Sequence, residues 1–452
     1  MQEIVREQVS EYSPFFNAEM ETIGYREQVE IWEAKLAKQV AYVYESSPFY
    51  KAKLKEAGLR PEQVRTLRDL QRVPFTGKDE IRRSQEQSPP LGNHLAAPLE
   101  KVVRVHSSSG TTGRPTYVGI TKHDRAVWTE IVARCFYAMG ARPNDVILHA
   151  VGLTFFVGGL PMQQAIEEIG ATFVPIGTGA SDRVVSTGRD LGATAIHCTP
   201  SYAIYLTEYV RNKVGMDPKD LGIHKFLCGA EPGIGNPAVR KQIEDAWAAK
   251  ACEGMGNADM APSIFGECYE QQGMHYCAQE FVIPEIIDPD TGENLEIEEG
   301  VTGELVYTAI DREACPLLRF RTRDRVTVWT NPCGCGRTSF RLRCIGRTDD
   351  MLIVLGVNVF PSAIKDVATS MRPRTTGEIQ VVLDRPGPKV EPPMRVKVEY
   401  GEQAGDLATL KKQIEERLRE KLVFRADVEL VAPGTLPRFE AKAKLVRRLY
   451  EE

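Results

Sequence analysis

The chain has 452 residues, of which 42% are apolar and 26% are charged, and its formal net charge is −5. This length is too great for one hydrophobic core, so we expect two or more domains. The slightly acidic balance, without a long block of Lys or Arg, argues against a nucleic-acid or membrane-surface binding protein. No apolar run reaches the roughly 18 residues of a membrane span. The first residues lack the apolar core of a secretory signal, so we expect a cytoplasmic protein.

The first hundred residues are expected to form helices and loops, with helical apolar spacing from Tyr25 to Ser46. Short apolar runs then alternate with amphipathic stretches, which indicates βαβ units and a parallel sheet covered on both faces. The apolar runs are Val146–Val151, Ala171–Ile176, Ala193–Thr199 and Ile223–Gly229. The amphipathic stretches are Arg125–Met139, Leu160–Ile169, Ser201–Val214 and Asn236–Lys250, the last with a Pro at its start.

The chain becomes β-rich from Pro284 to Thr330, and a second unit begins after Gly346. This unit has expected strands at Met351–Val354, Ile379–Leu383 and Met394–Tyr400 and helices that begin near Ser362 and Leu407. A compact α+β unit of about 100 residues is a common domain size. We therefore expect an α/β protein: a large N-terminal domain, residues 1–347, with parallel sheets and a β-rich subdomain, and a small α+β domain, residues 348–452.

A Ser/Thr/Gly-rich loop, HSSSGTTGRP, occupies residues 106–115. Its glycines let backbone N–H groups approach a triphosphate, its hydroxyls donate hydrogen bonds, and Arg114 offsets negative charge. The spacing of a Walker loop is absent. Taken alone, such a cluster is more often a polar surface turn, so the motifs that follow decide its interpretation.

Further short motifs follow in chain order: GAEP at 229–232, RTRD at 321–324, GRTDDML at 346–352, GVNVFPS at 356–362 and LPRFEAK at 436–442. Each alone could be a turn or a solvated charge run. Together with residues 106–115, and in this order, they resemble the adenylate-forming superfamily of acyl-CoA synthetases, luciferases and peptide-synthetase adenylation domains. The phenylacetate–CoA ligase branch is the most similar, and the resemblance covers nearly the whole chain.

The resemblance implies a role for each motif. GAEP packs against adenine, Asp324 accepts from the ribose hydroxyls with Arg347 nearby, Asp349 is the hinge pivot, and Gly356 lies on the coenzyme A path. Lys442 would be catalytic, between the carboxylate and the α-phosphate, although Ala441 replaces the usual glycine before it. The implied nucleotide-binding residues are Ser107, Ser108, Ser109, Gly110, Thr111, Thr112, Gly113, Arg114, Gly229, Ala230, Glu231, Pro232, Asn257, Asp324 and Arg347.

The implied reaction is ATP-dependent acid–thiol ligation. A carboxylate attacks the α-phosphate of ATP, pyrophosphate leaves, and coenzyme A then displaces AMP from the acyl-adenylate; the protein supplies positioning and charge stabilisation. The alternatives are a ligase with a carrier-protein thiol as acceptor, a flavin-cofactor adenylyltransferase and a non-catalytic nucleotide-binding module. The expected partners are small molecules, namely the carboxylate, ATP and coenzyme A, and no nucleic acid or membrane is expected. A homodimer is the one oligomer that we consider for the chain.

The magnesium ligand departs from the family pattern. Asn257 stands where the family has a glutamate, and a neutral amide oxygen is a weaker magnesium ligand than a carboxylate. Either Asp259 or Glu253 substitutes, or the phosphates and water hold the metal.

A zinc site is also predicted. Cys333 and Cys335 flank a glycine, and Cys268 and His275 lie upstream, which completes a Cys₃His set for tetrahedral zinc; Cys277 is the rival ligand. The alternative is that these are ordinary thiols in a glycine turn, but similar ligases carry Cys and His at these places. This zinc would be structural.

The acid is expected to be aromatic, such as phenylacetate or a benzoate. The resemblance places Leu153–Leu160 near the acyl group, and Phe155 or Phe156 could face an aromatic ring, although adjacent Phe residues after a strand are more often core.

Overall fold

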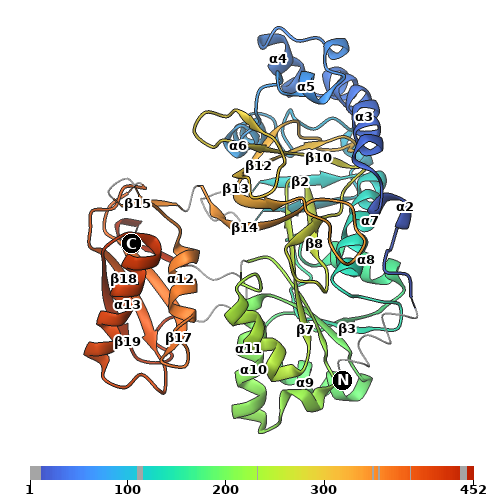
Figure 1. The fold of residues 1–452 in the computed structure, drawn as a ribbon. Coiled ribbons are helices and arrows are strands. Elements are labelled where there is room, and N and C mark those ends of the chain that lie inside the picture. Colours follow the sequence, from blue (N-terminus) through green and yellow to red (C-terminus); the bar gives the residue numbers. More distant parts are fainter. Residues whose placement is uncertain are drawn as a thin grey trace.

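The computed structural model describes residues 12–108, 116–231, 233–348, 351–354, 357–386, 388–437 and 445–451. In Figure 1 the residues after 350 form a smaller unit that lies beside the rest of the chain. Their hydrophobic core, from Leu352 to Val428, is separate from the two clusters formed by residues 32–342. Among the described helices, none combines the length and the apolar character needed to cross a bilayer.

Short helices precede the main sheet. The longest of them, α3, buries Trp32, Leu36, Val40 and Val43 on one face, and the Trp32 indole donates to the Gln279 carbonyl at 2.6 Å. This spacing of three or four residues is that of an amphipathic helix. The bounds are α2 Ala18–Glu21, α3 Tyr25–Ser46, α4 Pro48–Glu56, α5 Leu67–Leu70 and α6 Lys78–Gln87, with single turns at Pro61–Gln63 and Leu99–Lys101.

The described residues form a 12-stranded sheet in the order β11-β10-β12-β13-β14-β9-β8-β7-β6-β5-β3-β4. Pairing is parallel from β7 to β4 and antiparallel from β11 to β7. The parallel strands are β3 Val146–His149, β4 Thr172–Pro175, β5 Ala195–Cys198, β6 Lys225–Cys228 and β7 Lys250–Asn257. The antiparallel strands are β8 Ala261–Glu267, β9 Met274–Tyr276, β10 Val282–Ile287, β11 Asn294–Leu295, β12 Thr302–Ala309, β13 Phe320–Trp329 and β14 Arg341–Arg347.

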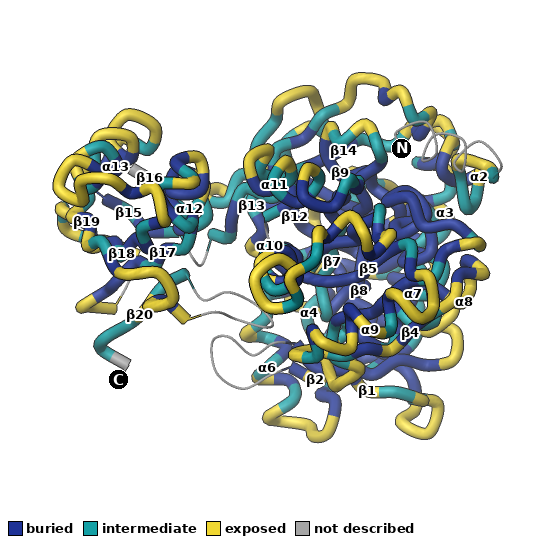
Figure 2. The backbone as a smooth tube through the Cα atoms, turned by 90° about the horizontal axis from the view of Figure 1, so that it is seen from below, coloured by how far each residue is buried: buried dark blue, intermediate teal, exposed yellow. Residues whose placement is uncertain are grey.

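Helices cover both faces of the parallel strands, because alternate side chains of a strand point to opposite faces. In β3, Ile147 joins the core that contains α7 and α8, whereas Leu148 joins the core that contains α9, α10 and α11. Every residue of β5 and β6 is buried, and β5 is drawn dark blue in Figure 2. The helices are α7 Lys122–Ala138, α8 Leu160–Ile169, α9 Ser181–Leu191, α10 Pro200–Tyr209 with a π-helical extension at Val210–Val214, and α11 Pro237–Trp247, with a single turn at Pro218–Leu221.

The C-terminal unit is an α+β sandwich. Its described strands form a sheet in the order β19-β18-β17-β20 and a separate β15–β16 hairpin, and α13 buries Leu410, Ile414 and Leu418. The bounds are β15 Leu352–Val354, β16 Val357–Val359, α12 Pro361–Thr369, β17 Thr375–Leu383, β18 Met394–Tyr400, α13 Leu407–Leu422, β19 Ala426–Val431 and β20 Val446–Arg448, with a final turn at Leu449–Glu451. The predicted α/β class with a smaller C-terminal sheet unit is confirmed.

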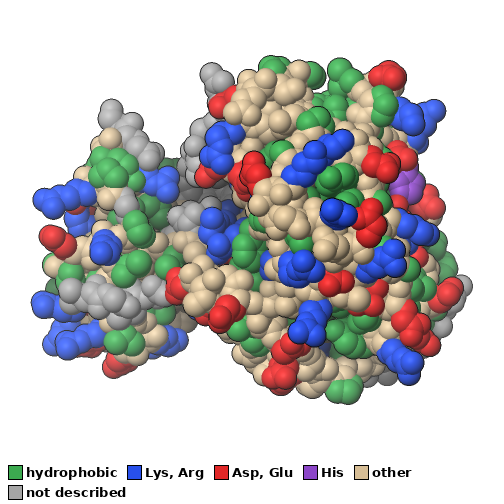
Figure 3. Space-filling view, turned by 90° about the horizontal axis from the view of Figure 1, so that it is seen from above, with side chains coloured by type: hydrophobic (Ala, Val, Ile, Leu, Met, Phe, Trp, Pro, Cys, Tyr) green, Lys and Arg blue, Asp and Glu red, His purple; other side chains and the backbone are tan. Residues whose placement is uncertain are grey.

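Acidic and basic side chains are interspersed over the face drawn in Figure 3. That face shows no large area of one sign, which agrees with the formal charge of −5.

Candidate nucleotide site and metal cluster

The two stems of the Ser/Thr/Gly-rich loop are held together by hydrogen bonds. Strands β1 (Arg104–Ser107) and β2 (Tyr117–Ile120) pair antiparallel with Ser107 opposite Tyr117. The Ser108 N–H donates to the Thr116 carbonyl at 3.0 Å, and the Thr116 N–H donates to Ser108 Oγ at 3.1 Å. Ser107 and Ser108 are buried, so these two predicted nucleotide-binding residues form the base of the loop.

The loop base is tied to the β7–β8 turn through Asp259. Thr116 Oγ1 donates to Asp259 Oδ1 at 3.0 Å, and Lys78 Nζ lies 2.5 Å from Asp259 Oδ2. Each carboxylate oxygen of Asp259 therefore has a partner within the protein, and the residue is buried. Asn257 Oδ1 accepts from the Asp259 N–H at 2.8 Å, which fixes the turn that follows β7.

The predicted adenine turn follows β6. Ala230 has a φ of 71°, a conformation that costs energy for a residue with a Cβ atom and is frequent at functional sites. A Cβ at Gly229 would lie 3.0 Å from the Gly254 carbonyl oxygen, so the turn passes close to β7. Glu231 accepts from the Ser201 N–H at 2.8 Å and thereby caps the first turn of α10.

The predicted ribose residues are brought together across two strands. Asp324 on β13 is the register partner of Arg347 on β14, and Arg347 Nη1 donates to Asp324 Oδ1 at 3.1 Å. Asp324 is buried, whereas a third of the Arg347 side chain is exposed. The carboxylate is therefore fixed and charge-compensated before any nucleotide binds.

Strand β7 connects the adenine turn to the phosphate-loop base. At one point of the strand, the Glu253 carboxylate accepts from the Gly235 N–H and is buried beside Glu267. Burial first, and repulsion by Glu267 second, raise the pKa of Glu253 to about 7. At the end of the strand lies Asn257, next to the Asp259 contacts. The loop that contains Gly235 also abuts Arg343 of β14, the strand that carries Arg347.

Other predicted site residues lie outside the described residues, so their roles stay predictions. They are Ser109, Gly110, Thr111, Thr112, Gly113 and Arg114 of the phosphate loop, Pro232, the hinge residue Asp349, Gly356 and the catalytic candidate Lys442.

Phe155 and Phe156 are 46% and 50% exposed. The Phe155 carbonyl accepts from the Ser107 N–H at 3.0 Å, and its ring lies 5.7 Å from the Tyr117 ring. Among the described residues, both phenylalanines thus lie beside the phosphate-loop base with about half of each side chain exposed.

The four predicted zinc ligands converge. Their ligand atoms, from Cys268, His275, Cys333 and Cys335, all lie within 4.8 Å of one another. The sulfurs of Cys268 and Cys333 are 3.6 Å apart, and tetrahedral zinc with Zn–S bonds of about 2.3 Å places two sulfurs about 3.8 Å apart. The rival Cys277 is not in this group; its thiol donates to the His275 carbonyl.

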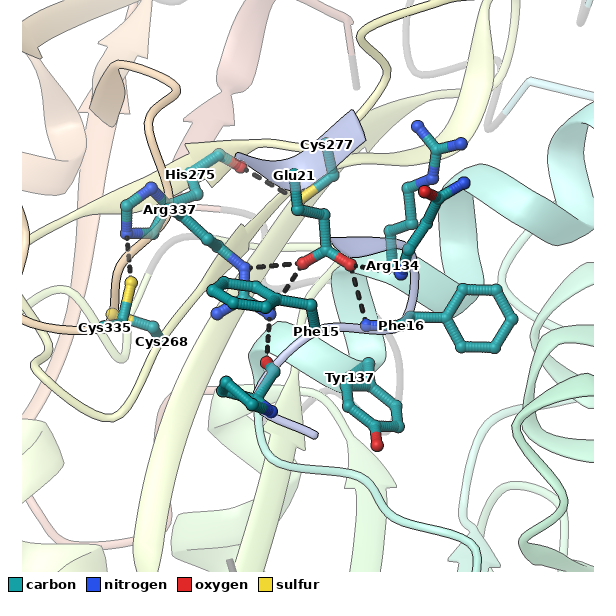
Figure 4. A network of polar contacts seen from close by, with 12 residues as sticks. Phe15, Phe16, Glu21, Arg134, Tyr137, Cys268, His275, Cys277, Cys335 and Arg337 are labelled. Atoms are coloured by element: carbon teal, nitrogen blue, oxygen red, sulfur yellow. Dashed lines mark hydrogen bonds and ion pairs between the residues drawn. The ribbon is translucent and has the colours of Figure 1, made fainter. Parts of the chain in front are cut away.

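Contacts around the cluster orient its ligands. His275 Nδ1 lies 3.3 Å from the Ser339 carbonyl oxygen, which leaves Nε2 facing Cys335 Sγ at 3.3 Å. A hydrogen bond with Cys268, aided by His275 and opposed by burial, lowers the pKa of the Cys335 thiol well below its ordinary value. Figure 4 shows the next layer, in which Arg337 and Glu21 form a buried ion pair at 2.7 Å. The N-terminal segment is therefore anchored beside the cluster.

The contacts of Lys78 and Thr116 were not predicted. They lie far from Asp259 in the sequence, and no short motif relates the three residues. The signal that could have directed attention to Thr116 is its place directly after the phosphate-loop motif.

Comparisons with known proteins place this geometry in a family. The AMP-binding enzyme family matches residues 29–309, and the AMP-binding enzyme C-terminal domain matches residues 356–448. The phenylacetate-coenzyme A ligase of Thermus thermophilus is 39% identical over 94% of this chain and 97% of its own length. The enzyme of the same name from Escherichia coli is 34% identical over 94% of this chain and 95% of its own length.

A solved relative, 2-hydroxyisobutyryl-CoA ligase, is known in more than one state. Its postadenylation-state structure superimposes on this chain with a TM-score of 0.89 at 31% sequence identity. The match covers 97% of this chain and 93% of the relative's chain. In the thioesterification state the TM-score is 0.72 at 32% identity, with 96% and 92% covered. This chain therefore belongs to the AMP-binding enzyme family, together with the phenylacetate-coenzyme A ligases.

Proposed function

We propose that this enzyme is an ATP-dependent acid–CoA ligase that forms an acyl-adenylate and then an acyl-CoA, releasing pyrophosphate and AMP. The observation that carries the proposal is the prearranged Asp324–Arg347 pair, which joins β13 to β14. Strand β14 also abuts the loop after the adenine turn. A ribose held by this carboxylate would extend its phosphates toward the loop whose base is Ser107 and Ser108. The Asp324–Arg347 pair, which matches the ribose-binding motifs of the family, also argues that the enzyme binds a nucleotide substrate.

The chemistry divides among the chain's own residues. Ser109 to Arg114 would bind the β- and γ-phosphates, and Lys442 would neutralise the charge that builds up between the carboxylate and the α-phosphate. Asp349 would be the pivot at the boundary between units 1–347 and 348–452, and Gly356 would line the path of the coenzyme A thiol.

We assign the magnesium ion mainly to the phosphates and water. Asp259 has both oxygens engaged, by Thr116 and Lys78, and burial raises the pKa of Glu253, which disfavours its charged form. Asn257 remains a neutral oxygen donor at the end of β7. This arrangement suits magnesium, which keeps several water ligands and binds substrate phosphates.

We assign a structural zinc to Cys268, His275, Cys333 and Cys335. The ligand set, its spacing and the hydrogen bond that orients His275 all suit tetrahedral zinc. Such a metal would join the end of β8 and the strand β9 to the segment before β14, and it would hold the Arg337–Glu21 pair in place.

The acid is proposed to be aromatic, of the phenylacetate or benzoate type. The names of the two phenylacetate-coenzyme A ligases above support this choice. The solved relative is named for a branched hydroxy acid instead, and Phe155 and Phe156 are exposed here, so selectivity must be measured directly.

The test is a pyrophosphate-exchange screen with purified enzyme, ATP and a panel of aromatic and aliphatic acids. Exchange that depends on an aromatic acid, followed by coenzyme A consumption, supports the proposal. Faster exchange with short aliphatic acids or 2-hydroxyisobutyrate contradicts the aromatic assignment. Exchange without consumption of coenzyme A contradicts the proposed acceptor and favours a carrier-protein thiol.

A further inference from the structure

Polar side chains of α11, of α12 and of residues next to these two helices link the C-terminal unit to the large unit. Asn236, at the start of α11, donates from Nδ2 to Asp366 Oδ1 of α12 at 2.6 Å. Six residues further along each segment, Arg372, which follows the end of α12, donates to the Gln242 side-chain oxygen of α11. In Figure 1, α12 lies on the side of the small unit that faces α11.

The Asn236 amide is fixed before it meets Asp366. Its Oδ1 accepts from the Ala238 N–H at 2.9 Å and caps α11, so its Nδ2 has to point away from the helix. The preceding residue, Gly235, donates its N–H to the buried Glu253 carboxylate. The loop that leads from the adenine turn to α11 is therefore anchored to β7 through Gly235. It presents the Asn236 side-chain N–H to the small unit as an oriented hydrogen-bond donor.

This contact belongs to one arrangement of the two units. The chain superimposes on 2-hydroxyisobutyryl-CoA ligase with a TM-score of 0.89 in the postadenylation state and 0.72 in the thioesterification state. Coverage is nearly the same in the two comparisons, 97% and 96% of this chain. The arrangement seen here is thus closer to the postadenylation state than to the thioesterification state.

We propose that Asn236 and Asp366 are positioning residues that select the adenylate-forming arrangement of the C-terminal unit. Neither needs to touch substrate. The contact joins the end of the nucleotide-binding loop to the unit that carries Lys442, so it favours the state in which the lysine acts. This inference rests on the proposed function, because it assigns the contact to one of two half-reactions.

The expected effect is modest. A hydrogen bond to a charged group near the surface, with the Arg372–Gln242 contact left in place, should change the ratio of the two arrangements about fivefold. Replacement of the donor by a like charge should reach at least this value, because two facing carboxylates repel.

The test uses Asn236→Asp, Asp366→Asn and the double variant in the full-length enzyme. Aspartate is as good a helix cap as asparagine, so Asn236→Asp keeps α11 but places a second carboxylate opposite Asp366. In Asp366→Asn the amide oxygen still accepts, so this variant is the mild control. The double variant restores one donor and one acceptor in reversed order.

Asn236→Asp should slow carboxylate-dependent pyrophosphate exchange about fivefold and leave thioester formation from a supplied acyl-adenylate unchanged. The double variant should recover the exchange rate. Equal losses in both half-reactions, or no recovery in the double variant, would overturn the proposal.

Amide hydrogen exchange of residues 236–247 and 361–369, measured without substrates, reads the contact independently of catalysis. Faster exchange in Asn236→Asp that reverts in the double variant supports the contact, and unchanged exchange contradicts it. If the unmodified enzyme shows no pyrophosphate exchange with any acid, the proposed function fails, whereas hydrogen exchange still decides the contact.

Discussion

The buried carboxylate of Glu253 should make the stability of the large unit depend on pH. Burial and the neighbouring Glu267 raise its pKa from 4.5 to about 7 in the folded protein. Between these two values the folded state binds more protons than the unfolded state. The free energy of unfolding therefore falls as the pH rises through this window and stays lower above it.

The size of the effect follows from the two pKa values. The rise of the pKa by about 2.5 should lower the free energy of unfolding by on the order of 3 kcal/mol between pH 4 and pH 8. Glu253→Gln cannot ionise, and its amide oxygen can still accept from the Gly235 N–H. This variant should therefore gain stability relative to the unmodified protein as the pH rises, with the gain fully developed near pH 8.

The assay is urea unfolding followed by tryptophan fluorescence at pH 5 and pH 8. All four tryptophans lie between residues 32 and 329, so the signal reports on the unit that contains Glu253. Glu267→Gln is the matched control, because removing the repelling charge should lower the pKa of Glu253 and shrink the pH dependence. A stability difference between Glu253→Gln and the unmodified protein that is the same at both pH values would refute this reasoning.

Three further predictions concern the metal, the ribose and the lysine. Purified protein should contain about one zinc per chain, and Cys335→Ser should lose it together with several degrees of thermal stability; elemental analysis without zinc, combined with an unchanged melting temperature, would disprove the site. Asp324→Asn should raise the KM for ATP about tenfold, because it removes the negative charge that pairs with Arg347 and that is proposed to accept from the ribose hydroxyls; an unchanged KM would remove Asp324 from the nucleotide site. Lys442→Ala should slow adenylation about 100-fold or more and leave thioester formation from a supplied acyl-adenylate largely intact, whereas Lys444→Ala should do much less. Single-turnover measurements of both half-reactions decide this last assignment, and equal losses in the two halves would contradict it.

Elements with a strong local pattern were predictable from the sequence. The bounds of α3 and α8 match the apolar periodicity, and α11 begins at Pro237, where its missing N–H costs nothing. The helix α9, Ser181–Leu191, was not predicted, because Gly188 and several polar residues weaken its propensity. Tertiary packing forms it nonetheless: a Cβ at Gly188 would lie 3.4 Å from Leu148, so the glycine lets the helix approach β3.

Some contacts of the candidate site were likewise predictable from the sequence, and others were not. The Asp324–Arg347 pair and the Cys/His cluster were predictable, because each residue carries a recognisable chemistry or lies in a motif. The Lys78–Asp259 and Asn236–Asp366 contacts were not, because they join residues with no sequence relation and depend on how the elements pack. The boundary between residues 347 and 348 stays a prediction.

The measurement that tests the central proposal most directly is carboxylate-dependent exchange of pyrophosphate into ATP, followed by addition of coenzyme A to the same reaction. The proposed function predicts no exchange without an acid, rapid exchange with an aromatic acid, and release of AMP and acyl-CoA when coenzyme A is added. Exchange that needs no carboxylate, or an acyl-adenylate that coenzyme A leaves untouched, would contradict it.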